Sequence, residues 1–77
     1  MAGENNLEKN VEYVVSIVNR NPGMVFVQLA EGLRKKYKNE TGKTLRLRHA
    51  NDAIHEAGRR ELIRKDTDMM VRYYPTN

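Results

Sequence analysis

Apolar residues recur at helical spacing in three parts of the chain. The first part carries Leu7, Val11, Val14, Val15 and Val18. Valines are stiff in helices, but three- and four-residue spacing kept for more than three turns predicts a helix. We expect Met1 to Glu4 to be a short disordered leader, and Asn5 to cap the helix with Glu8 three residues on. Proline and glycine in the segment 19–23 are expected to end it.

A second helix is expected from Val27, after a short segment at 24–26 that is suited to a single edge pairing. Its apolar stripe consists of Phe26, Ala30, Leu33 and Tyr37, with Leu29 beside it. Gly32 lies within this helix, and close approach of another helix is enough to explain a glycine there. The turn-forming residues 39–43 are expected to break the helix before the third one.

The stretch 44–59 has the clearest division into two helix faces. The apolar face holds Leu47, Ala50, Ala53, Ile54 and Ala57. The opposite face holds Arg48, His49, Asp52, His55, Glu56 and Arg59. We expect this helix to begin at about Leu45 with Thr44 as its N-cap, although the alternation at 44–48 would also suit a short strand followed by a helix from near His49.

A C-terminal hairpin is predicted by two short runs of β-forming residues, 62–65 and 69–74, on either side of an Asp-Thr-Asp turn. In the second run Met69, Val71 and Tyr73 share the face expected to pack on the helices, while Met70, Arg72 and Tyr74 are half exposed. No linker or repeat interrupts the chain. The sequence therefore predicts one α+β domain over 1–77, with an ordered core at about 6–74: three helices, a short strand and a hairpin.

Composition narrows the classes of function. The chain has 77 residues, so its core is small, and with no cysteine it has neither disulfides nor thiolate metal sites. Two histidines six residues apart do not form a metal site alone. Fourteen Lys and Arg against ten Asp and Glu give a net charge of +4, which favours an anionic partner without choosing among DNA, RNA and acidic membrane. No run is apolar enough for a transmembrane helix or signal peptide, and we expect a soluble intracellular protein of the cytoplasm, nucleoid or nucleus.

Basic residues crowd the start of the third helix, where the helix dipole disfavours each cation by up to about 1 kcal/mol. A bound phosphate would relieve Arg46, Arg48 and His49, whereas pairing of Arg48 with Asp52 one turn on is the alternative. Lys35 and Lys36 belong to a basic run on the second helix. That run is either a solvated face or, together with Lys43 and the arginines of the third helix, one phosphate-binding patch.

The predicted order of three helices, a short strand between the first two, and a final hairpin resembles the winged-helix branch of the helix-turn-helix proteins, over roughly Leu7 to Tyr74. The passage 57–64, Ala-Gly-Arg-Arg-Glu-Leu-Ile-Arg, is similar to the residue-Gly-Leu-Ile passage that leaves the third helix in such domains, with three residues inserted. The resemblance implies that the third helix enters the DNA major groove. It implies groove contacts by Arg46, Arg48, His49, Asp52 and His55. It implies phosphate contacts by Lys43, Arg59, Arg64, Lys65 and Arg72.

We therefore expect a double-stranded DNA-binding protein, either a transcription regulator or an architectural factor, with Lys35 and Lys36 adding to the phosphate clamp. No catalytic motif or glycine-rich phosphate loop is present, so we expect neither an enzyme nor a cofactor. Two alternatives stay open: a winged-helix protein-interaction module that uses Asp52 and Glu56, and an RNA or single-strand binder that stacks bases on Tyr73 and Tyr74. Homodimer formation through Tyr13 and Ile17 also stays open.

Overall fold

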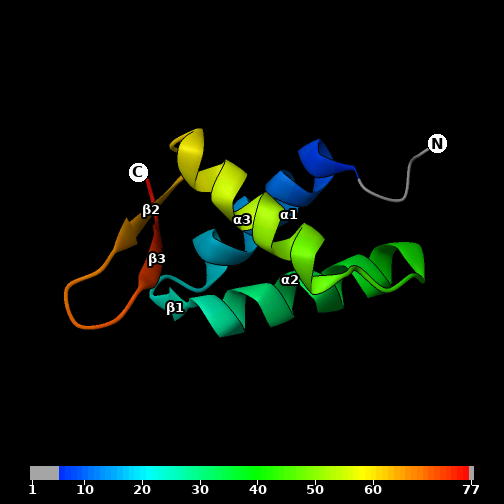
Figure 1. The fold of residues 1–77 in the computed structure, drawn as a ribbon, viewed down its shortest axis with the longest axis horizontal. Coiled ribbons are helices and arrows are strands. Elements are labelled where there is room, and N and C mark those ends of the chain that lie inside the picture. Colours follow the sequence, from blue (N-terminus) through cyan, green and yellow to red (C-terminus); the bar gives the residue numbers. More distant parts are fainter. Residues whose placement is uncertain (1–5, 77) are drawn as a thin grey trace.

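Three helices and a three-stranded antiparallel sheet make up residues 6–76, the part of the chain that the computed structural model describes (Figure 1). In chain order the elements are α1 (Leu7–Arg20), β1 (Met24–Val25), α2 (Phe26–Thr41), α3 (Leu47–Arg59), β2 (Ile63–Asp66) and β3 (Arg72–Pro75). The helices pack against one another and the sheet lies at one end of the bundle. This order confirms the predicted α+β domain of three helices, a short strand and a C-terminal hairpin. The predicted leader and the cap at Asn5 lie outside the described residues.

The predicted stripe on α1 faces the core, and Asn6 caps the helix by accepting a hydrogen bond from the Lys9 N–H at 3.1 Å. A Cβ at Gly32 would lie 3.6 Å from the Ile17 Cγ2 atom, an ordinary van der Waals distance, so the packing of α1 on α2 leaves room for alanine and does not by itself explain this glycine. Tyr13 is buried, with 8% of its surface exposed. The proposed dimer surface of Tyr13 and Ile17 is therefore wrong, since both residues already pack within this molecule.

The start of α3 differs from the prediction. Leu45 is buried and lies in an extended segment ahead of the helix, whereas Leu47, the first helical residue, is 56% exposed. The Leu45 carbonyl accepts a hydrogen bond from Arg34 Nε at 2.9 Å, which holds the segment against α2. The helix consequently begins two residues later than predicted, with Arg46 rather than Thr44 at the N-cap. The alternative of a strand at 44–48 is also wrong.

The sheet has the order β1-β3-β2, with Tyr73 opposite Lys65 on one side and opposite Met24 on the other. Because β3 begins only at Arg72, the residues ahead of it form the hairpin loop instead of a strand. Met69 is 94% exposed and Met70 52% exposed. The expectation that Met69 and Val71 pack on the helices is therefore wrong, and of that predicted face only Tyr73 is buried.

One polar side chain lies in the core formed by the three helices. Asn10 is fully buried, and neither its amide nitrogen nor its oxygen has a hydrogen-bond partner within residues 6–76. An amide buried without partners costs stability, so Asn10 is a weak point of this core. Among the described helices, none has the length and apolar character needed to cross a membrane.

Candidate nucleic-acid interface

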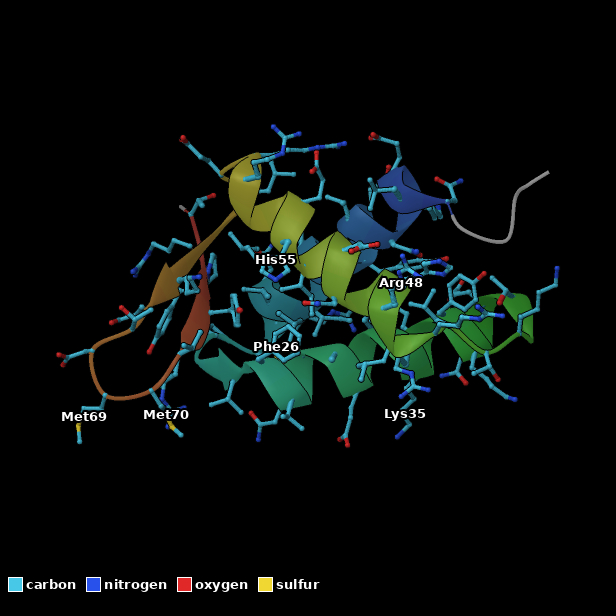
Figure 2. The ribbon with its side chains drawn as sticks, in the orientation of Figure 1. Phe26, Lys35, Arg48, His55, Met69 and Met70 are labelled. Atoms are coloured by element: carbon cyan, nitrogen blue, oxygen red, sulfur yellow. The ribbon has the colours of Figure 1, made fainter. Side chains whose placement is uncertain are left out.

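The outward side of α3 carries a continuous polar stripe, which we call the outer α3 face. Its members recur at three- and four-residue spacing on the side opposite the buried alanines and Ile54. They are Arg48, Asn51, Asp52, His55, Gly58 and Arg59. Figure 2 shows Arg48 and His55 along this helix. A Cβ added to Gly58 would meet nothing within 4 Å, so this part of the face is open to a ligand backbone.

A hollow of about 810 Å³ separates the outer α3 face from the hairpin. His55, Gly58 and Arg59 line its helix side, and Arg64 and Lys65 line its strand side. Lys65 lies opposite the buried Tyr73 in the strand register, so its side chain leaves the sheet on the face that packs toward the helices. The structure thus brings basic residues from α3 and from β2 to the two sides of one hollow.

The N-terminal end of α3 adds further cations. Lys43 and Arg46 are exposed in the segment just before the helix, and Arg48 is exposed in its first turn. No side chain of residues 6–76 caps this end, and its first turn holds no acidic residue. Its backbone N–H groups are therefore available to an anion, which the helix dipole also favours.

An ion-pair network lies on the opposite flank of α3, toward α1. Glu56 accepts hydrogen bonds from Arg59 (Nη2 to Oε2, 2.6 Å) and from Arg60 (Nε to Oε2, 2.7 Å). Arg60 also pairs with Glu8 of α1 at 2.6 Å. Hydrogen bonds from Arg59 and then Arg60 lower the pKa of Glu56 to about 2. Glu56 was predicted on the outward face of α3, but its ionised carboxylate is paired with arginines on the flank of the helix. The same pairing offsets part of the charge of Arg59.

The carboxylate left on the outer α3 face is that of Asp52. It is exposed, and no ion pair joins it to Arg48 in the described part of the chain. The alternative of an Arg48–Asp52 pair is not realised in this structure. His49 is half-buried on the side toward Glu56, so it lies at the edge of the face, while His55 lies near its centre.

The α2 lysines do not join this surface. The Lys36 ammonium lies 5.4 Å from the centre of the Tyr13 ring on α1. Lys35 borders a separate hollow with the α1–β1 turn and Glu31, and Figure 2 shows it extending away from α3. The predicted single patch of α2 lysines and α3 arginines is therefore wrong. The basic residue that faces α3 across the hollow comes from the hairpin, not from α2.

Two hairpin residues predicted to contact phosphates, Arg64 and Arg72, instead make contacts within the sheet and its turn. Arg72 Nη1 donates to the Gly23 carbonyl at 2.8 Å, which ties β3 to the turn before β1. The Arg64 guanidinium lies 5.0 Å from the Tyr74 ring centre, opposite in the register. Tyr73 is buried, and Arg64 lies over one face of the half-buried Tyr74 ring, so little of either ring is left for base stacking.

Asn51 and Gly58 belong to the outer α3 face but were not among the predicted site residues. Asn51 lies three residues after Arg48 and four before His55, so helical spacing alone could have found it. An asparagine on a helix in the major groove can bind adenine through two hydrogen bonds. Leu47 was assigned to the core from its helical spacing with Ala50 and Ile54, but it is the first residue of α3 and is exposed, which gives this end of the helix an apolar contact.

Comparisons of the chain with protein-family models, curated proteins and solved structures find no match. Within residues 6–76, no three His, Asp or Glu side chains are placed to hold a metal ion. The geometry and charge of the outer α3 face and the hairpin are therefore the features that indicate a function.

Proposed function

We propose that this chain is a non-enzymatic double-stranded DNA-binding protein that inserts α3 in the major groove and rests its hairpin on the flanking backbone. The observation that carries the proposal is the hollow between α3 and β2. One side presents groups that can bond base edges, and the other presents Lys65. A protruding helix with an adjacent basic strand suits a duplex, whose major groove admits one helix between two phosphate ridges.

The side chains of the outer α3 face differ in the base that each can bind. Arg48 suits the two acceptors of guanine, Asn51 the donor and acceptor of adenine, and Asp52 the amino group of cytosine. His55 adds a further contact at the centre of the face. Asp52 has no ion-pair partner among residues 6–76. Pairing with cytosine would give this carboxylate a role, because it otherwise repels the duplex.

The backbone contacts come from the two ends of the surface. Lys43 and Arg46 flank the start of α3, and Lys65 lies on the hairpin. Arg59 lies between them but shares its charge with Glu56. Phosphate contacts of this kind fix register and carry most of the non-specific affinity.

The test is a binding series with duplex DNA, single-stranded DNA and structured RNA at about 50 and 200 mM salt, the range over which phosphate contacts are resolved. We expect the duplex to bind best. Arg48→Ala should lose about 1–3 kcal/mol against the preferred duplex. Lys35→Ala, which removes a cation on the side of α2 that points away from α3, is the control and should bind nearly as the wild type. Wild-type affinity of Arg48→Ala at low salt would refute the groove assignment.

One observation favours a second candidate, a protein-interaction module. Met69, Met70 and Val71 form an exposed apolar tip on the hairpin, and Asp66 and Asp68 lie just before it in the sequence. Acidic residues beside an apolar tip suit a protein surface better than a phosphate backbone. This candidate predicts negligible duplex binding even at low salt, together with loss of partner binding in Met69→Ser.

A further inference from the structure

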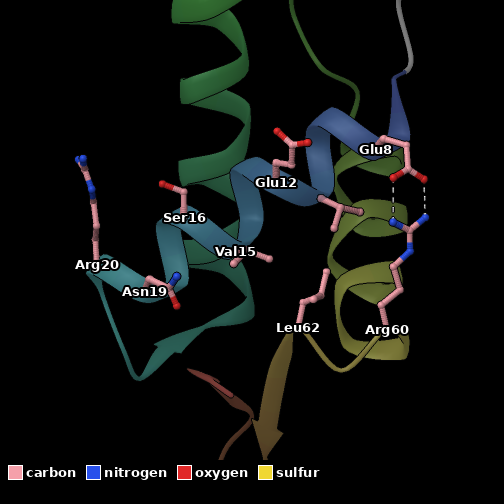
Figure 3. A pocket seen from close by; sticks show the side chains of 9 residues that line it. Glu8, Glu12, Val15, Ser16, Asn19, Arg20, Arg60 and Leu62 are labelled. Atoms are coloured by element: carbon pink, nitrogen blue, oxygen red, sulfur yellow. Dashed lines mark hydrogen bonds and ion pairs between the residues drawn. The ribbon is translucent and has the colours of Figure 1, made fainter. Parts of the chain in front are cut away.

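A second hollow, the α1 groove, lies on the outward side of α1 between this helix and the segment that leaves α3 (Figure 3). Val11 forms its floor, and Val15 and Leu62 form apolar walls, with 40% of Leu62 exposed. None of the residues of the outer α3 face lines it. An apolar groove with a polar rim on a small domain is a candidate surface for a partner.

The order of charges along the α1 groove indicates which partner fits. Glu8 and Glu12 lie toward the N-terminal end of α1, and Arg20 lies at its C-terminal end, with Val15 and Ser16 between them (Figure 3). A surface that is acidic at one end and basic at the other complements itself when a copy is turned by 180°. Two-fold dimers need a self-complementary patch of this kind.

We propose that the α1 groove binds the α1 groove of a second copy of this chain, with the two α1 helices antiparallel. If the two-fold axis passes near Ser16, then Glu12 and Arg20 each lie four residues, or about 6 Å along the helix, from the axis. The rotation places the Arg20 of the second copy beside Glu12, and the same pair forms again on the other side. The small Ser16 lets the helices approach to the usual 8–10 Å or so.

The Glu12 and Arg20 side chains are exposed and can form these pairs with a second copy. Arg20 is exposed and has no ion-pair partner among residues 6–76. Glu12 meets Lys9 only at 3.9 Å, and both side chains are largely exposed. Glu8 is already held by Arg60, so it closes the end of the groove. The apolar centre at Val15 and Leu62 supplies the affinity, and the exposed charges set the direction of the helices.

The association is independent of DNA binding, and its test uses no nucleic acid. Sedimentation equilibrium of the full chain measures how the mass rises from the 9.0 kDa of one copy toward twice that value with concentration. Glu12→Arg and Arg20→Glu each place like charges across the axis twice, so each should weaken self-association roughly tenfold or more. An equimolar mixture of the two variants restores opposite charges in both pairs, and should dimerise at least as well as the wild type.

Matched control variants separate the loss of the pairs across the two-fold axis from a general effect of charge on self-association. Glu31→Arg and Lys38→Glu make the same changes on exposed positions of α2, outside the α1 groove, and should leave the wild-type dimer intact. Circular dichroism melts check that each variant folds. The proposal is overturned if the wild type stays monomeric up to about 1 mM, which corresponds to less than about 4 kcal/mol of association. It is also overturned if mixing the two variants does not restore the dimer.

Discussion

The position of Lys65 makes a quantitative prediction about DNA binding. Lys65 lies on β2 at the hollow that faces α3, whereas Lys35 lies on the outer side of α2 (Figure 2). Lys65→Gln and Lys35→Gln remove the same charge, so their long-range effects are matched. If Lys65 contacts a phosphate, its loss makes the slope of log K against log salt less steep by about 0.9. Lys35→Gln should leave this slope unchanged.

The size of the effect is within reach of a titration. A slope difference of 0.9 or so means that the ratio of wild-type to Lys65→Gln affinity falls about 3.5-fold between 50 and 200 mM salt. Fluorescence anisotropy of a labelled duplex at four salt concentrations measures it, and thermal melts check the fold of both variants. Equal slopes for the wild type and Lys65→Gln, or a larger change for Lys35→Gln, would refute the assignment of the hairpin to the backbone.

Two predictions concern stability. Leucine has the same branching and number of side-chain atoms as asparagine, so Asn10→Leu should remove a buried unpaired amide and stabilise the fold by about 1–3 kcal/mol, which denaturant titration measures. A loss of stability would show that the amide is satisfied. Arg60→Ala should be less stable than the wild type above pH 4.5 or so, because the depressed pKa of Glu56 means that its ionised form stabilises the folded state. That gap should shrink as the pH falls toward 2, the folded-state pKa, and a gap independent of pH in thermal melts would contradict the role of the network.

The helices were predictable because their apolar residues repeat with the helical period. Val14, Leu33 and Ala53 are each fully buried, as their stripes require. The start of α3 was not predictable in this way, because Leu45 and Leu47 are both apolar and only two residues apart. The choice between them depends on packing against α2 and on the hydrogen bond from Arg34, which lies eleven residues away in the sequence.

The hairpin shows a second limit of sequence patterns. Alternation correctly placed Tyr73 and Tyr74 on opposite faces, but it could not show where β3 begins. The strand starts at Arg72 because that residue pairs with Val25 of β1 and with Asp66 of β2, and alternation along β3 alone shows neither pairing. Met69 and Met70 therefore fall in the loop. Likewise, only the packing of α1 on α2 brings Lys36 to Tyr13 and away from α3.

If the chain binds a duplex, the salt dependence of that binding depends on how many basic side chains are free of other contacts, rather than on the net charge of +4. Arg60 is committed to Glu8 and Glu56, and Lys36 to the Tyr13 ring. The same holds for Arg64 and the Tyr74 ring. The cations left for phosphates, Lys43, Arg46 and Lys65, would give a slope of about −2.7 for one copy. A dimer formed through the α1 groove leaves both outer α3 faces uncovered, so the slope should approach about −5.4 on a duplex that engages both copies. A slope that doubles for the wild type but not for Arg20→Glu would link self-association to DNA binding, and equal slopes would separate them.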